Sequence, residues 1–108
     1  MEPSHKYIAD LAGALPDIPP HSIVSRAIYA GDDVKVTLFG FAAGQELSEH
    51  TASTPAIIHF LQGEADLTLG SERMQAGPGA WAHMPAHLPH SIVARTPVIM
   101  LLILIQQD

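Results

Sequence analysis

The chain contains no cysteine among its 108 residues. This absence excludes disulfide bonds, thiolate metal sites and a cysteine nucleophile, and by itself it does not indicate a compartment. Lysine and arginine are scarce, with five of them against eleven Asp and Glu, so the formal net charge is −6. Because the five basic residues are scattered, we expect no surface for the phosphates of a nucleic acid or for an anionic membrane.

Long hydrophobic segments are missing as well. The longest apolar run, from Val98 to Ile105, is too short to cross a bilayer. Residues 1–17 include acidic side chains and only a short apolar patch, unlike a signal peptide with its basic start and longer apolar centre. A chain of 108 residues that is 47% hydrophobic suits one domain with one core. We therefore expect a single-core cytoplasmic protein.

What the chain does contain from residue 22 onward is typical of short strands separated by turns. Alternating apolar and β-branched residues predict strands, while Gly, Pro and Asp mark the turns between them. The pattern indicates roughly eight strands in a sandwich, jelly roll or barrel. The predicted strand segments are 23–29, 34–41, 44–50, 56–61, 65–69, 72–75, 80–84, 91–95 and 98–105.

The beginning of the chain has a different pattern. Ile8, Leu11 and Leu15 would share one face of a helix over residues 6–15, which Pro16 would end. Further prolines then predict an extended connector. We therefore expect two parts: residues 1–21 as a short N-terminal helix with its Pro-rich connector, and residues 22–108 as an all-β barrel.

The last predicted strand, Val98 to Ile105, is apolar on both faces. A central strand of an antiparallel sheet has one wet face unless something covers it. A second subunit would cover it, which predicts a homodimer with this sheet partly buried. The alternative is that the N-terminal helix covers the sheet within one chain.

The stretch from Gly77 to His90, GPGAWAHMPAHLPH, contains three histidines, three prolines and two glycines. Prolines cannot donate to a sheet ladder, so this stretch predicts a turn between the strands that flank it. A turn that carries histidines between buried strands is where an all-β protein would hold a metal or a ligand.

Spacing within and around this stretch resembles the two motifs of the cupin superfamily. In the first motif, His50 follows Gly44 after five residues and Gly63 stands at the closing glycine. In the second motif, Gly79, Pro85 and His90 keep the expected spacing. Over Val34 to Ile105 the chain thus resembles a small single-domain cupin of the type-2 conserved-barrel kind. The resemblance implies a double-stranded β-helix, or jelly roll.

The chain departs from both motifs. The second His of the first motif falls on Ala52, and its Glu falls on Ala56 or Ile57. The Gly of the second motif is replaced by His87. Of the usual three His and one Glu, only His50 and His90 carry over.

The resemblance implies that His50 and His90 point into the barrel and bind one divalent transition metal (Zn, Ni, Fe, Mn or Cu). The alternative is a metal-free cavity in which the two imidazoles hydrogen-bond a ligand. Further candidate ligands are His59, His83 and His87. Strand alternation places His59 on the outer face, where we expect it to form a cross-strand pair with His83. His87 is expected to be a solvated turn residue.

The function we expect is that of a small-molecule-binding cupin with a degenerate metal site, with its ligand held near His50 and His90. The alternative is a metal-dependent enzyme of dioxygenase or isomerase type acting on a small organic substrate. No catalytic residue is assigned. The residues expected either to line an apolar pocket or to fill the core are Val36, Leu38, Ile58, Phe60, Trp81 or its neighbour Met84, and Ile92.

Overall fold

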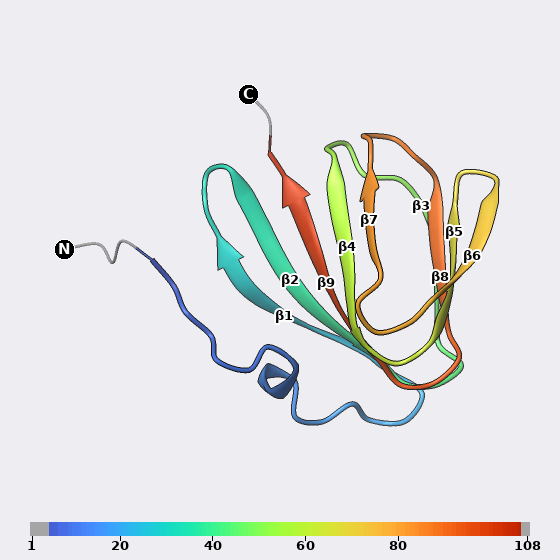
Figure 1. Ribbon diagram of the computed structural model, residues 1–108, viewed down its shortest axis with the longest axis horizontal. Helices are drawn as coiled ribbons and strands as arrows, with labels where there is room; N and C mark the ends of the chain where they lie inside the picture. Colours follow the sequence, from blue (N-terminus) through green and yellow to red (C-terminus); the bar gives the residue numbers. More distant parts are fainter. Residues whose placement is uncertain (1–4, 107–108) are drawn as a thin grey trace.

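The computed structural model describes residues 5–106, which form two antiparallel sheets that curve toward each other (Figure 1). The first sheet has the strand order β1-β2-β9-β4-β7, and the second has the order β3-β8-β5-β6. The strands are β1 (Ile23–Ala30), β2 (Val34–Phe41), β3 (Glu46–His50), β4 (Ala56–Gln62), β5 (Ala65–Leu69), β6 (Glu72–Ala76), β7 (Trp81–Met84), β8 (His90–Ala94) and β9 (Val98–Ile105). The predicted all-β jelly roll is therefore confirmed.

Inward-facing side chains of both sheets form the main core. Four of the predicted interior residues belong to it, and each is no more than 2% exposed: Ile58, Phe60, Met84 and Ile92. In β4 and β8, buried residues that face the core alternate with half-buried residues on the outer face, except at the exposed end of β4.

The prediction that Val36 and Leu38 face the barrel interior is wrong. Both belong to a second cluster on the outer face of the five-stranded sheet, whereas Phe39 and Phe41 pack in or against the main core. The alternation of β2 is misleading, because Lys35 and Thr37 lie on the inner face with Phe39 and Phe41, while the N-terminal segment covers the apolar outer face.

The predicted helix over residues 6–15 is wrong in extent, since only a single 3-10 turn forms, η1 (Ala12–Ala14). Gly13 inside the segment and Pro16 behind it disfavour a longer helix, and an isolated helix this short is marginal in water. Ile8, Leu11 and Leu15 nevertheless pack against the second cluster. The segment therefore covers part of the outer sheet face without being a helix.

The predicted parts 1–21 and 22–108 both extend beyond the described residues. Within residues 5–106, no helix has the length and apolarity needed to cross a membrane.

One end of the barrel is closed by contacts between two connections, β4–β5 and β8–β9. Gly63 in the first has φ of +88°, and a Cβ there would overlap the carbonyl oxygen of Pro97 in the second. The Glu64 N–H donates to Thr96 Oγ1 at 2.9 Å, and the Arg95 N–H donates to the Glu64 carbonyl at 2.8 Å. The two sheets are therefore tied together at this end.

Candidate functional site

His50 and His90 lie opposite each other at the other end of the barrel, where β3 ends and β8 begins. The centroids of their rings are 4.1 Å apart, and the ring planes are inclined by 58°. The two residues that the motif spacing singled out are therefore brought together by strand pairing.

Main-chain carbonyls determine which nitrogen of each ring carries the proton. His50 Nδ1 lies 2.9 Å from the Ser48 carbonyl oxygen, and His90 Nδ1 lies 3.0 Å from the Leu88 carbonyl oxygen. A carbonyl oxygen only accepts, so each Nδ1 must donate a hydrogen. In the neutral rings each Nε2 therefore keeps a lone pair, which can accept a hydrogen bond or coordinate a cation.

The two rings differ in their exposure to solvent. His90 is 5% exposed, whereas His50 is exposed at the end of its strand. A ligand that reaches both rings would approach from the His50 side, at the mouth of the barrel.

The donor set does not fit a metal held by the protein alone. The other two positions of the motif carry the methyl groups of Ala52 and Ala56, and Ala56 is buried. Within residues 5–106, no group of three or more His, Cys, Asp or Glu side chains could hold a metal ion. Catalytic metal sites use about three protein ligands and structural sites four, so two imidazoles fall short.

The other candidate histidines lie elsewhere. His59 pairs with Trp81, and His83 pairs with Ile57, so both imidazoles lie on the outer face of the five-stranded sheet. The predicted cross-strand pair is wrong in register, because His59 and His83 are diagonal neighbours two positions apart. His87 is exposed with φ of +68°, the left-handed conformation that glycine favours, and its N–H donates to the Ala52 carbonyl at 2.8 Å.

Within residues 5–106, the interior residues predicted either to line an apolar pocket or to fill the core do the latter. Ile58, Phe60, Met84 and Ile92 expose at most 2% of their surface, so no water-sized space touches them appreciably. They fill the barrel, and Trp81 lies outside it with 60% of its surface exposed. A ligand at His50 and His90 must therefore sit at the mouth and not deep inside.

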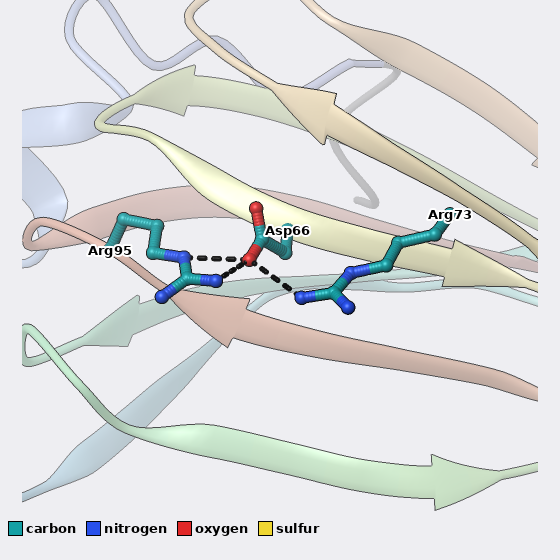
Figure 2. A network of polar contacts seen from close by, with 3 residues as sticks. All are labelled: Asp66, Arg73 and Arg95. Atoms are coloured by element: carbon teal, nitrogen blue, oxygen red, sulfur yellow. Dashed lines mark hydrogen bonds and ion pairs between the residues drawn. The ribbon is translucent and has the colours of Figure 1, made fainter.

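A second polar group, not predicted from the sequence, lies on the four-stranded sheet. Figure 2 shows Arg95 and Arg73 reaching the same carboxylate oxygen of Asp66. Arg95 donates through Nε at 2.6 Å and also through Nη2, while Arg73 Nη2 lies 3.3 Å away. The hydrogen bond from Arg95 is the main cause that lowers the pKa of Asp66 below 3.8, against burial, which raises it. The group ties β5 to β6 and to the end of β8.

The sequence pattern gave only a weak signal for this group. Asp66 alternates with the apolar residues of its strand, which indicates a wet face, yet the residue is only 7% exposed because the two arginines cover it. Arg73 lies on the strand that a short hairpin joins to the strand of Asp66, so its proximity to Asp66 could have been inferred from the sequence. Arg95 is distant from Asp66 in sequence, so its contact could not.

The fold and the paired histidines at a barrel mouth define a cupin-type barrel, and comparison of the sequence agrees. A profile of the Cupin domain matches residues 37–105. Because this match spans more than half of the chain, the chain belongs to the cupin domain family. No curated protein sequence matches at a significant level.

Solved structures show the same fold. A cupin superfamily protein from Desulfitobacterium hafniense is 28% identical with a TM-score of 0.83, over 97% of this chain and 94% of that chain. A conserved protein of unknown function from Streptococcus pyogenes is 27% identical with a TM-score of 0.82, over 97% and 91%. The DMSP lyase DddQ from Ruegeria pomeroyi is 20% identical with a TM-score of 0.73, over 79% and 47%, a likeness of fold alone.

Proposed function

We propose that this cupin binds a small organic molecule at the mouth of its barrel through His50 and His90. The observation that carries the proposal is the pair of rings 4.1 Å apart, each with Nδ1 bound to a main-chain carbonyl. This arrangement leaves two Nε2 lone pairs as acceptors, so a ligand with neighbouring O–H or N–H donors suits the site.

The burial of His90 favours such a ligand. His90 is only 5% exposed as a residue, so a hydrogen bond from a ligand to its ring would displace little solvent. The exposed His50 leaves one side of the ligand open. The proposed ligand is therefore small, carries hydrogen-bond donors at one end and is only partly enclosed.

A ligand screen monitored by the melting temperature tests the proposal. For any compound that stabilises the protein, His50→Ala and His90→Ala are each expected to weaken binding by about tenfold, the worth of one hydrogen bond of about 1.4 kcal/mol. His83→Ala, an exposed imidazole on the outer sheet face, is the matched control and should bind as well as the wild type. Equal binding by all four proteins would contradict the proposal.

The second candidate is a metal-dependent enzyme of dioxygenase or isomerase type. It is favoured by the fixed Nδ1–H tautomer, which is also the arrangement that metal-bound histidines use. A divalent cation would supply Lewis-acid chemistry, but its remaining ligands would have to come from the substrate or water, since Ala52 and Ala56 provide none.

Elemental analysis of the untagged protein separates the two candidates. Binding of an organic ligand that persists in excess chelator supports the first. Stoichiometric metal that His50→Ala removes, together with ligand binding lost in chelator, supports the second. The cytoplasmic location expected from the sequence stays a prediction.

A further inference from the structure

The outer face of the four-stranded sheet carries a groove of about 530 Å³ that is open to solvent. Its lining residues come from β5, from β6 and from the segment that follows β8, and we call it the arginine groove. They are Asp66, Arg73, Met74, Gln75 and Arg95. The volume lies within the range of small-molecule sites.

The charges in this groove do not cancel. At neutral pH Asp66 contributes one negative charge and the arginines contribute two positive charges, so the group keeps one positive charge on a chain of net charge −6. Two of the five basic residues meet here, while the other three lie in the N-terminal segment, β1 and β2. The groove is therefore a local cationic site on an acidic molecule.

The two arginines offer more hydrogen-bond donors than Asp66 uses. Both approach the same oxygen, Oδ2, and they lie on either side of the carboxylate (Figure 2). Each guanidinium carries several N–H groups, yet Arg95 gives two hydrogen bonds to that oxygen and Arg73 gives one. Among the described residues 5–106, neither guanidinium has another partner. Their side chains are 69% and 57% exposed for Arg73 and Arg95, so the remaining donors face the groove or the solvent.

The arrangement also brings two positive charges together. Because both guanidinium groups contact one oxygen, they lie close enough for a single small anion to reach both of them. Like charges this close repel each other, and one carboxylate offsets only part of that repulsion. Arg95 already pairs with Asp66 through two nitrogens, so the contact of Arg73 at 3.3 Å adds little to the pairing. A second anion would relieve the repulsion and use the remaining donors.

We propose that the arginine groove binds the carboxylate group of a small organic anion, in a second ligand site outside the barrel. Charge selects the class of ligand. A carboxylate carries one negative charge and neutralises the group, whereas a doubly charged phosphate would leave an excess negative charge on an acidic chain. The planar fork of a guanidinium also fits the two oxygens of a carboxylate. The exposed amide of Gln75, opposite Asp66 on β6, can donate to a further oxygen of the ligand.

Arg95 is held in place before a ligand arrives. Its main-chain N–H donates to the Glu64 carbonyl at 2.8 Å, and its side chain is fixed by Asp66. Asp66 in turn is buried, and its neighbour Leu67 packs in the main core. Binding therefore requires ordering chiefly of Arg73, which has the longer contact and the more exposed side chain.

The arginine groove and the mouth of the barrel take different chemical groups. An ionised carboxylate only accepts hydrogen bonds, so it suits guanidinium donors and not the Nε2 lone pairs of neutral His50 and His90. The groove also lies toward the other end of β8, because Arg95 follows the last residue of this strand and His90 is its first. Each of the two proposals can therefore fail without the other.

Titration with sodium benzoate, followed by the arginine Nε–H signals in a nitrogen–proton NMR spectrum, tests the proposal. The signals of Arg73 and Arg95 should shift and saturate with a dissociation constant on the order of 1 mM, since the groove is open to solvent. Benzamide, which has a similar shape without the charge, should cause no shift. Shifts that are absent, that grow without saturation or that benzamide reproduces would overturn the proposal.

Two further titrations define the ligand class and the site. Inorganic phosphate should bind more weakly than benzoate, and tighter binding of phosphate would refute the choice of a carboxylate. His50→Ala should bind benzoate as the wild type does, because the mouth of the barrel is not used. Loss of benzoate binding in this variant would move the carboxylate to the mouth and contradict the proposal.

Two substitutions that each remove one positive charge locate the site. Arg73→Gln should weaken benzoate binding by about tenfold, because one of the two guanidinium groups is lost. Lys35→Gln, at an exposed position on the other sheet, is the matched control and should bind as well as the wild type. Equal weakening in both variants would mean that net charge alone attracts benzoate, and the groove would not be the site.

A third variant guards against an indirect effect of the substitution. Arg95 keeps its bonds to Asp66 in Arg73→Gln, so this variant should retain the circular dichroism and melting curve of the wild type. Arg73→Lys keeps the charge but loses the planar fork, so its affinity should fall between those of the wild type and Arg73→Gln. Wild-type affinity in Arg73→Lys would contradict pairing of a carboxylate with the fork.

Discussion

Asp66 and His90 are the buried polar side chains of the described residues 5–106, and each is satisfied in a different way. His90 donates from one ring nitrogen to a main-chain carbonyl, and in the neutral ring the other nitrogen keeps a lone pair. One oxygen of Asp66 accepts hydrogen bonds from two arginines, Arg73 in β6 and Arg95 just after β8. His90 could therefore accept a hydrogen bond from the proposed ligand, whereas Asp66 holds strands together.

The ion group predicts a pH-dependent contribution to stability. The pKa of Asp66 is lowered in the folded protein, chiefly by the hydrogen bond from Arg95. A lowered pKa stabilises the fold above the unfolded pKa of about 3.9, and this contribution is lost as pH falls through the folded value. Asp66→Asn should therefore melt below the wild type at pH 7, and the difference should shrink from pH 5 to pH 2.

Melting curves of both proteins across this range check the prediction. Glu72→Gln, at an exposed position in the same hairpin, is the control and should follow the wild-type curve. A difference for Asp66→Asn that stays constant down to pH 2 would show that its cause is packing and not charge.

Single residues also show what the sequence could reveal about the site. His50 and His90 were found because motif spacing fixes their places on paired strands. The register of His59 and His83 could not be found, since the choice of opposing residues depends on where two distant strands meet. Asp66 was expected on a wet face, because nothing in its own strand shows that Arg95 covers it.

Among the elements, the connections between strands differ in how tightly they pack. Gly63 and Gly44 have nearly equal φ, +88° and +84°, but only Gly63 has neighbours within the reach of a Cβ. Gly63→Ala should lower the free energy of unfolding by about 3 kcal/mol or more, since backbone strain adds to a clash with another connection. Gly44→Ala carries the strain alone and should cost about 1–2 kcal/mol.

Urea unfolding of the two variants measures this difference. Because the backbone conformation is matched, the excess for Gly63→Ala isolates the contact with Pro97. Equal losses in the two variants would mean that the β8–β9 connection moves aside without resistance.

Strand positions were predictable because turns are marked by Gly, Pro and Asp, and each predicted strand is present. The orientation of β2 was not, since Lys35 and Thr37 on the face of Phe39 and Phe41 make the face of Val36 and Leu38 look like the inner one. The N-terminal segment was predicted to be helical from its apolar spacing. Its residues do cover the sheet, but Gly13 and the short length leave only one turn of 3-10 helix.

For the whole molecule, the distribution of charge predicts how the homodimer expected from the apolar last strand would respond to salt. The outward-facing residues of β2, β9, β4 and β7 include no Asp, Glu, Lys or Arg. Salt would therefore screen no attraction across that face, while it would screen the repulsion between two chains of net charge −6. The dimer should therefore tighten as sodium chloride is raised. Sedimentation at low and high salt measures the change, and a dimer that dissociates in high salt would indicate ion pairs across a different interface.

The contact at Gly63 has a consequence for motion. The connections that meet there share two main-chain hydrogen bonds, from the Arg95 and Thr96 N–H groups to the Glu64 carbonyl. The histidines lie at the far ends of their strands, where the β3–β4 and β7–β8 connections share one such bond, from the His87 N–H to the Ala52 carbonyl. Local opening costs least where few such bonds must break. Fluctuations at His50 and His90 can therefore occur while the two sheets stay joined at Gly63, so exchange of the proposed ligand would not require unfolding of the barrel.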